Sequence, residues 1–160
     1  MSRMHGPKEC FVPVRQDASQ VIISYEKTAD GKKNAYWYEV YLWLKKGKPT
    51  LEQVKRAVYD DINQQVKAKI VGGYKWNDMH VWLSEENQMN FAQAVVPAMF
   101  KIGEQEDGAP IYHTFETKEE MTAFATACTQ WRQQCLQEGW QRKDAIDWTP
   151  YEEALEKMNA

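Results

Sequence analysis

The sequence has no hydrophobic run long enough to cross a membrane. A transmembrane helix needs about 18 or more consecutive apolar residues, and none of the 160 residues belongs to such a run. The first ten residues also lack the apolar centre of a signal peptide. We therefore expect no membrane partner and synthesis in a reducing, intracellular compartment.

Cysteine and histidine are few and scattered. Of the three cysteines, Cys128 and Cys135 lie seven residues apart on an expected helix, too far apart to bond to each other, and Cys10 belongs to no recognisable catalytic motif. The three histidines form no His-x-x-x-His motif, and no Cys-x-x-Cys pair exists. The sequence therefore predicts no metal, no other cofactor and no thiol chemistry.

Recognisable catalytic motifs are also absent. The chain lacks the Gly-x-Ser-x-Gly elbow, the phosphate-binding Walker loop and the dinucleotide-binding glycine pattern. Paired carboxylates such as Asp60-Asp61 and Glu85-Glu86 fall at positions where helix surfaces ordinarily carry charge. We therefore predict no catalytic residues and a protein that is not an enzyme.

Charge is unevenly distributed along the chain. Residues 1–80 hold 14 Lys and Arg against 9 Asp and Glu, whereas residues 81–160 hold 6 against 14. Such asymmetry is found in ordinary solvated surfaces, in basic contact surfaces and in copies that pack head to tail. All three interpretations remain open at this point.

Aromatic residues are abundant, with 7 Trp, 8 Tyr and 5 Phe. Each large ring buries much surface, so the core of a chain of this size needs fewer rings than this sequence contains. Some rings should therefore lie on a surface that meets a partner or another copy. An alternative is nucleic-acid binding, because lysines flank the aromatic segment 35–44, at positions 27, 32, 33, 45, 46 and 48. The pI of about 5.7 argues against it.

Periodicity and turn residues predict an α+β fold, in which short antiparallel β-hairpins alternate with three main helices and a short C-terminal helix. The expected strands are residues 9–14, 20–27 and 35–44, followed by hairpins at 74–76 with 80–83 and at 99–102 with 111–115. The expected helices are residues 50–70, 85–96 and 117–138, with the last one starting near Thr149. The Lys-rich turn before Thr50 suggests an N-terminal β-rich attachment segment (1–48) and an α+β domain (49–160).

Helix ends are marked by residues with known capping roles. Thr50 with Gln53 and Thr117 with Glu120 match the capping-box spacing, and Ser84 precedes an acidic first turn. At the opposite ends, Gly72-Gly73 and Gly139 are typical helix stops.

A longer pattern extends over residues 62–91 and 98–148. It consists of a helix ending Ile70-Val71-Gly72-Gly73, an aromatic hairpin, the segment 81–91, a second hairpin (100–103 and 112–115) and the ending 136–148. This pattern resembles a small domain of unknown function from bacteriophage and prophage proteins of gut bacteria, often encoded near or fused to tail-fibre components. No catalytic residues carry over from it.

The resemblance implies a non-enzymatic structural or accessory protein, made in the bacterial cytoplasm and associated with the virion tail. Its partners would be other virion or assembly proteins, or a second copy as a homo-oligomer. The residues predicted for such an interface are four tryptophans and two amides: Trp37, Trp43, Trp76, Trp82, Gln88 and Asn90. In the alternative interpretation, these tryptophans belong to the core, and the two amides form hydrogen bonds that hold a helix to a hairpin. The runner-up function is a nucleic-acid-associated phage or mobile-element protein that uses the basic N-terminal half.

Overall fold

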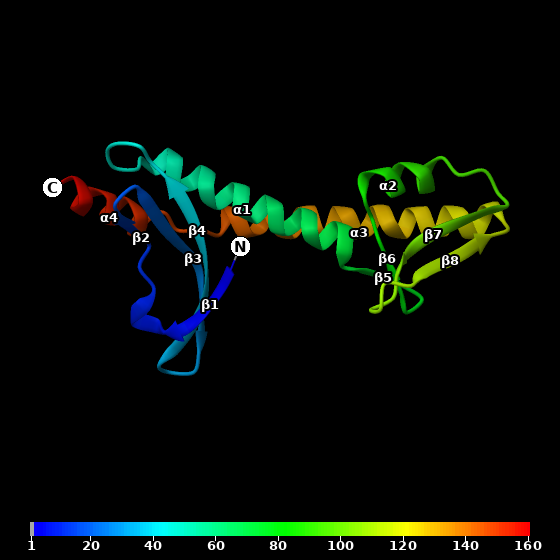
Figure 1. The fold of residues 1–160 in the computed structure, drawn as a ribbon, viewed down its shortest axis with the longest axis horizontal. Coiled ribbons are helices and arrows are strands. Elements are labelled where there is room, and N and C mark those ends of the chain that lie inside the picture. Colours follow the sequence, from blue (N-terminus) through cyan, green and yellow to red (C-terminus); the bar gives the residue numbers. More distant parts are fainter. Residues whose placement is uncertain (1) are drawn as a thin grey trace. The chain divides into compact units, whose positions relative to one another are not determined.

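The computed structural model describes residues 2–160, and its elements are shown in Figure 1. The strands are β1 (Ser2–Pro7), β2 (Val14–Asp17), β3 (Gln20–Asp30), β4 (Asn34–Trp43), β5 (Tyr74–Trp76), β6 (Met79–Val81), β7 (Ala98–Glu104) and β8 (Pro110–Phe115). The helices are η1 (Lys8–Cys10, a 3-10 turn), α1 (Leu51–Gly72), α2 (Glu85–Ala92), α3 (Lys118–Asp144) and α4 (Thr149–Asn159). All strand pairs are antiparallel, which confirms the predicted α+β class.

The chain divides into two compact units. Unit 1 contains the residues up to Asn63 together with Gln141–Ala160, and unit 2 contains Gln64–Trp140. The long helices α1 and α3 each contribute one end to unit 1 and the other to unit 2. The expected division at residue 48, between an attachment segment and an α+β domain, stays a prediction.

Unit 1 is built on a four-stranded sheet with the order β1-β4-β3-β2. The predicted strand 9–14 is wrong, because β1 ends at Pro7 and β2 begins only at Val14. Prolines at positions 7 and 13 explain the difference, since neither has an N–H to donate to a ladder. The strands predicted at 20–27 and 35–44 are confirmed as β3 and β4, within three residues at each end.

One face of this sheet packs on helices. Tyr25 of β3 pairs with Tyr38 of β4, and their rings stack at 5.5 Å. The Tyr25 hydroxyl donates to Asp61 of α1 at 2.5 Å, and the Tyr151 hydroxyl of α4 donates to the Ser24 carbonyl at 2.6 Å. Both tyrosines are buried, and burial raises the pKa of each well above its usual value. The side chains on the other face of β3 and β4 therefore point away from the helices.

Unit 2 combines the hairpins β5–β6 and β7–β8 with α2 and parts of α1 and α3. Its core includes a cluster of buried residues: Val81, Leu83, Phe91, Ile102, Phe115, Met121, Phe124 and Cys128. The two hairpins meet where the Trp82 N–H donates to the Ile102 carbonyl at 2.7 Å. Gly103 makes this approach possible, because a Cβ there would lie 1.9 Å from the His80 carbonyl oxygen.

Three of the predicted helix starts and one of the predicted stops are confirmed. Thr50 and Gln53 exchange backbone–side-chain hydrogen bonds, Ser84 accepts from the Asn87 N–H, and Thr117 accepts from the Glu120 N–H. The predicted stop at Gly72-Gly73 is confirmed, because α1 ends at Gly72. Helix α2 ends at Ala92, four residues before the expected end.

The predicted stop at Gly139 is wrong, because α3 continues to Asp144. Gly139 is buried, and a Cβ there would lie 2.6 Å from Val66 Cγ2 of α1. This glycine therefore permits close helix packing and does not end a helix.

Candidate functional site

The outward face of the sheet in unit 1 carries two exposed aromatic rings. Tyr41 and Trp43 occupy alternate positions of β4, on the side opposite Tyr38, and are 48% and 70% exposed. Ile22 of β3 pairs with Tyr41 and lies between it and Arg15 of β2. We call this surface, formed by Arg15, Ile22, Tyr41 and Trp43, the aromatic face. Its residues come from three adjacent strands, so its shape is fixed by the sheet.

A buried carboxylate lies beside the aromatic face. The Glu39 side chain is only 6% exposed, accepts from the Tyr41 hydroxyl at 3.2 Å and lies 3.6 Å from the Arg15 guanidinium. It also accepts from the Trp37 indole N–H at 3.4 Å. Desolvation, followed by the hydrogen bond to Glu39, raises the pKa of Tyr41 above its usual value. Glu39 therefore orients the Tyr41 ring and balances the charge of Arg15.

Trp37 is a core residue, although it points to the same side of the sheet as Trp43. It is 3% exposed, and the Phe11 ring packs against it edge-on at 6.1 Å. Gly6 of the neighbouring strand β1 lies against the far end of its indole. The segment between β1 and β2 therefore covers this end of the sheet and leaves Tyr41 and Trp43 uncovered.

Two predicted tryptophans belong to unit 2 and differ in environment. Trp76 is half-buried, with its ring 4.8 Å from Phe124 and 5.1 Å from His113, and it packs against the core cluster. Trp82 is half-exposed and lines a cavity of about 1090 Å³, together with charged residues of both signs such as Lys101 and Glu104. Trp82 is thus accessible, whereas Trp76 serves mainly the core.

The amides at the start of α2 hold this helix to the segment between β6 and α2. Asn87 Nδ2 donates to the Trp82 carbonyl and Gln88 Nε2 to the Leu83 carbonyl, each at 2.8 Å. Asn90, in contrast, is exposed on α2. The structure thus gives Gln88 a local contact and leaves the Asn90 side chain accessible. An interface role for either residue stays a prediction.

A family model matches residues 53–158, more than half of the chain. The chain belongs to the family described as Domain of unknown function (DUF4376). The DUF4376 match covers nearly all of α1 and every later element, and it begins after β4. The aromatic face therefore precedes the DUF4376 region, while Trp76, Trp82, Gln88 and Asn90 lie inside it. No curated protein and no solved structure matches the chain.

The described residues, 2–160, contain no cluster of three or more His, Cys, Asp or Glu placed to hold a metal ion. All three histidines have partners: His5 lies 2.7 Å from an Asp30 carboxylate oxygen, His80 lies 2.6 Å from the Gly72 carbonyl oxygen, and His113 lies 2.6 Å from a Glu120 carboxylate oxygen. Cys128 is buried, and burial raises the pKa of its thiol to about 12, which keeps it protonated and unreactive. Across residues 2–160 no helix is apolar over a length that would span a membrane.

Sequence reasoning missed Arg15, Ile22 and Tyr41 as members of the aromatic face, and Glu39 as the buried carboxylate beside it. Alternation along β4 places Tyr41 on the same face as Trp43, and this signal is present in the sequence. The pairing of β2 with β3, which brings Arg15 beside Ile22, depends on the strand order and has no local signal.

Proposed function

We propose that the chain is a non-enzymatic docking protein whose aromatic face binds a protein partner. The observation that supports this most directly is the exposure of Trp43 and Tyr41 on a sheet whose opposite face is covered by helices. Tryptophan and tyrosine dominate the energetic centres of protein interfaces, because they bury large areas with few rotatable bonds. Rings fixed on one strand of a sheet also lose little entropy when they bind.

The charge of unit 1 suggests an acidic partner surface. Residues 1–48, which include the sheet, hold nine Lys and Arg against five Asp and Glu. The remaining parts of unit 1, 49–63 and 141–160, hold five against eight. The positive balance lies with the strands, so an acidic partner is steered toward the sheet and away from the helices.

The partner we propose is another phage or prophage structural or assembly protein of the tail or tail fibre, with incorporation into the virion. Support for this assignment is the resemblance of residues 62–91 and 98–148 to a phage-associated domain. The DUF4376 match supports the coarser part of that resemblance, a domain of unknown function. The predicted alternatives to a heterologous partner are a second copy of the chain and nucleic acid.

Single-stranded nucleic acid is the second candidate, because the aromatic face also has features of a base-stacking platform. Two exposed rings lie two residues apart on one strand, about 7 Å along it. Arg15 adjoins them and three lysines follow Trp43, at positions 45, 46 and 48. Single-strand binders combine such rings with basic residues. The buried carboxylate of Glu39 beside the rings favours the protein partner over nucleic acid.

The test begins with mass spectrometry of phage particles purified from the host that encodes this chain. We expect the protein to be present, and the double variant Tyr41→Ala/Trp43→Ala to be depleted from the particles at equal expression. The matched control is Tyr112→Ala, which removes an exposed aromatic ring of unit 2 (58% accessible). Absence of the wild-type chain from the particles, or equal incorporation of the double variant, contradicts the proposal.

Nucleic-acid binding is tested separately by fluorescence anisotropy with a labelled oligothymidine at low salt. Binding whose affinity falls steeply as salt is raised supports the second candidate. The same double variant should then lose affinity. No binding at low salt eliminates this candidate.

A further inference from the structure

A neutral surface interrupts the charged exterior of unit 2. Residues 87–100 contain no charged side chain, and Arg132 is the only charged residue among residues 121–137 of α3. The exposed positions of this α3 stretch are threonine, alanine and glutamine, with that one arginine: Thr122, Ala123, Thr126, Thr129, Gln130, Arg132, Gln133, Gln134 and Gln137. Exposed helix faces normally carry charged residues. A run of about four turns with a single charge therefore suggests a surface that is covered in an assembly.

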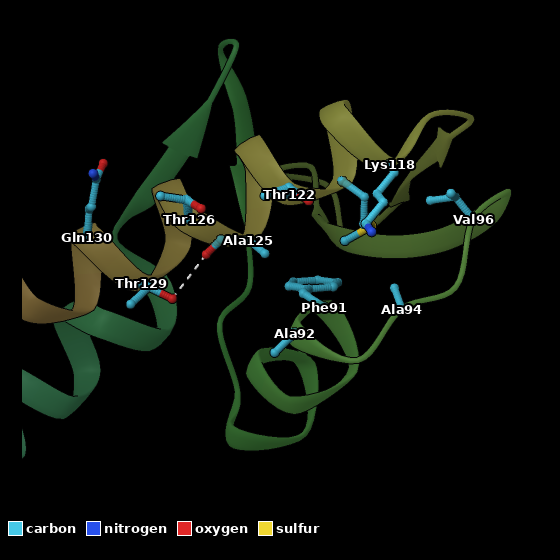
Figure 2. A pocket seen from close by; sticks show the side chains of 11 residues that line it. Phe91, Ala92, Ala94, Val96, Lys118, Thr122, Ala125, Thr126, Thr129 and Gln130 are labelled. Atoms are coloured by element: carbon cyan, nitrogen blue, oxygen red, sulfur yellow. Dashed lines mark hydrogen bonds between the residues drawn. The ribbon is translucent and has the colours of Figure 1, made fainter.

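This neutral surface includes an apolar groove between α2 and α3. Its volume is about 440 Å³, and of its eleven lining residues only Lys118 is charged. Figure 2 shows the Phe91 ring between the two helices, with Ala92 on the α2 side and Ala125 and Thr129 on the α3 side. The Thr129 hydroxyl donates to the Ala125 carbonyl at 3.1 Å, so its polar group is satisfied within the helix. The groove is large enough for one large ring.

The same face of α3 also presents a ring of that kind. Trp140 is 53% exposed and lies 18 residues after Thr122. Eighteen residues are five full helical turns, so Trp140 and Thr122 lie in line along α3, about 27 Å apart. One helix thus carries a groove near its start, on the neutral surface, and a protruding indole about one turn beyond the end of that surface.

We propose that two copies of the chain pair through this neutral face, with their α3 helices antiparallel. A two-fold axis midway between groove and indole, near Arg132, exchanges the two features and places Trp140 of each copy in the groove of the other. On either side of this axis Gln130 of one copy faces Gln134 of the other, and amides both donate and accept hydrogen bonds. The surface is thus complementary to itself.

Charge argues against a basic partner on this surface, and the groove and indole carried by one helix favour a second copy. Unit 2 holds six Lys and Arg against ten Asp and Glu, so a basic partner is drawn to the acidic remainder of the unit and not to the neutral face. Two acidic units repel each other where their charged surfaces meet, and this repulsion is smallest at the neutral face. This interface is separate from the aromatic face of unit 1, so each can fail independently in experiments.

The test uses the full chain, light scattering and sedimentation velocity over a concentration series. We expect dimers that dissociate on dilution. Gln130→Glu/Gln133→Glu and Gln130→Lys/Gln133→Lys each place like charges across the axis and should raise the dissociation constant at least about tenfold. An equimolar mixture of the two should regain the dimer, since opposite charges then face each other. Such recovery occurs only if the two faces meet.

The matched control is Gln64→Glu/Ala68→Glu, which adds the same charge at exposed positions of α1 and should leave the dimer unchanged. Trp140→Ala provides an independent variant and should also weaken the dimer at least about tenfold. Circular dichroism establishes that each variant is folded. The proposal is overturned if the wild-type chain is monomeric up to about 100 μM, if the charged variants dimerise like the wild type, or if the mixture stays monomeric.

Discussion

Arg142 of α3 donates two hydrogen bonds to Glu26 of β3, with Nε 2.9 Å from Oε2 and a terminal nitrogen 2.5 Å from Oε1. Glu26 has a φ of +54°, at the bulge where the register with β4 shifts after Tyr25. Side chains disfavour this left-handed conformation by about 1–2 kcal/mol. Because both charged groups are about three-quarters buried, the ion pair is strong enough to offset that strain.

Replacing Glu26 should therefore have two separable effects. Glu26→Ala removes the ion pair but keeps a Cβ in the left-handed conformation, and we expect a loss of about 2–3 kcal/mol in the free energy of unfolding. Glu26→Gly removes the same carboxylate and also the strain, so it should be more stable than Glu26→Ala by about 1 kcal/mol. Urea unfolding monitored by circular dichroism measures both. Equal stability of the two variants would show that the bulge is not strained.

The buried tyrosines of unit 1 predict sensitivity to alkali. Tyr25 and Tyr151 have pKa values raised by burial, whereas the same groups ionise near pH 10 in the unfolded chain. The unfolded state therefore loses protons first as the pH rises, so their contribution to stability is complete below pH 10 and falls above it. Each residue should lower the free energy of unfolding by about 1.4 kcal/mol per pH unit in that range.

Urea unfolding at a series of pH values from 8 to above 10 checks this prediction. Tyr151→Phe should reduce the alkaline slope by the contribution of one tyrosine. Tyr25→Phe should do the same, and it should also cost about 1–3 kcal/mol at neutral pH because the hydrogen bond to Asp61 is lost. A slope that is identical in the wild type and both variants would contradict the assignment.

Gly139 offers a test of the helix contact that sequence reasoning misjudged. Glycine to alanine inside a helix normally stabilises by about 1 kcal/mol. Here the added Cβ would lie 2.6 Å from Val66 Cγ2, a short and stiff branch, so Gly139→Ala should instead destabilise by about 1–3 kcal/mol. Adding Val66→Ala removes the clashing methyl, and the double variant should be more stable than Gly139→Ala alone. Additive losses would mean that the two positions do not interact.

The wrong stop at Gly139 and the different exposure of Trp37 and Trp43 share one physical cause. Signals that act within one turn, such as the Thr50 and Ser84 caps or the Gly72 stop, predicted real helix ends because their partners lie three or four residues away. Gly139 has the same local signature as a stop, but its role depends on Val66, 73 residues earlier. The exposure of Trp43 and the burial of Trp37 likewise depend on the segment that covers the sheet, which alternation does not reveal.

Two amide residues of α2, Gln88 and Asn90, differ in their surroundings and should differ in their effect on stability. Gln88 Nε2 donates to the Leu83 carbonyl at 2.8 Å, so Gln88→Ala should lower the free energy of unfolding by about 0.5–1.5 kcal/mol. Asn90 is exposed on the same helix, and Asn90→Ala should change stability by less than about 0.5 kcal/mol. Thermal unfolding of both variants measures the difference. A larger loss for Asn90→Ala than for Gln88→Ala would reverse this assignment.

Trp37 and Trp43 provide a matched pair on one strand and one side of the sheet. Trp37 is buried against Phe11, so Trp37→Ala leaves a cavity and should cost about 3–5 kcal/mol in the free energy of unfolding. Trp43 is largely exposed, so Trp43→Ala should cost less than about 1 kcal/mol. Urea unfolding of both variants measures these two losses in the free energy of unfolding. A large loss for Trp43→Ala would mean that this ring stabilises the fold, and a change in partner binding would then no longer report on docking. A small loss makes Trp43→Ala a clean probe of the aromatic face, because any effect on incorporation then arises at the surface and not from unfolding.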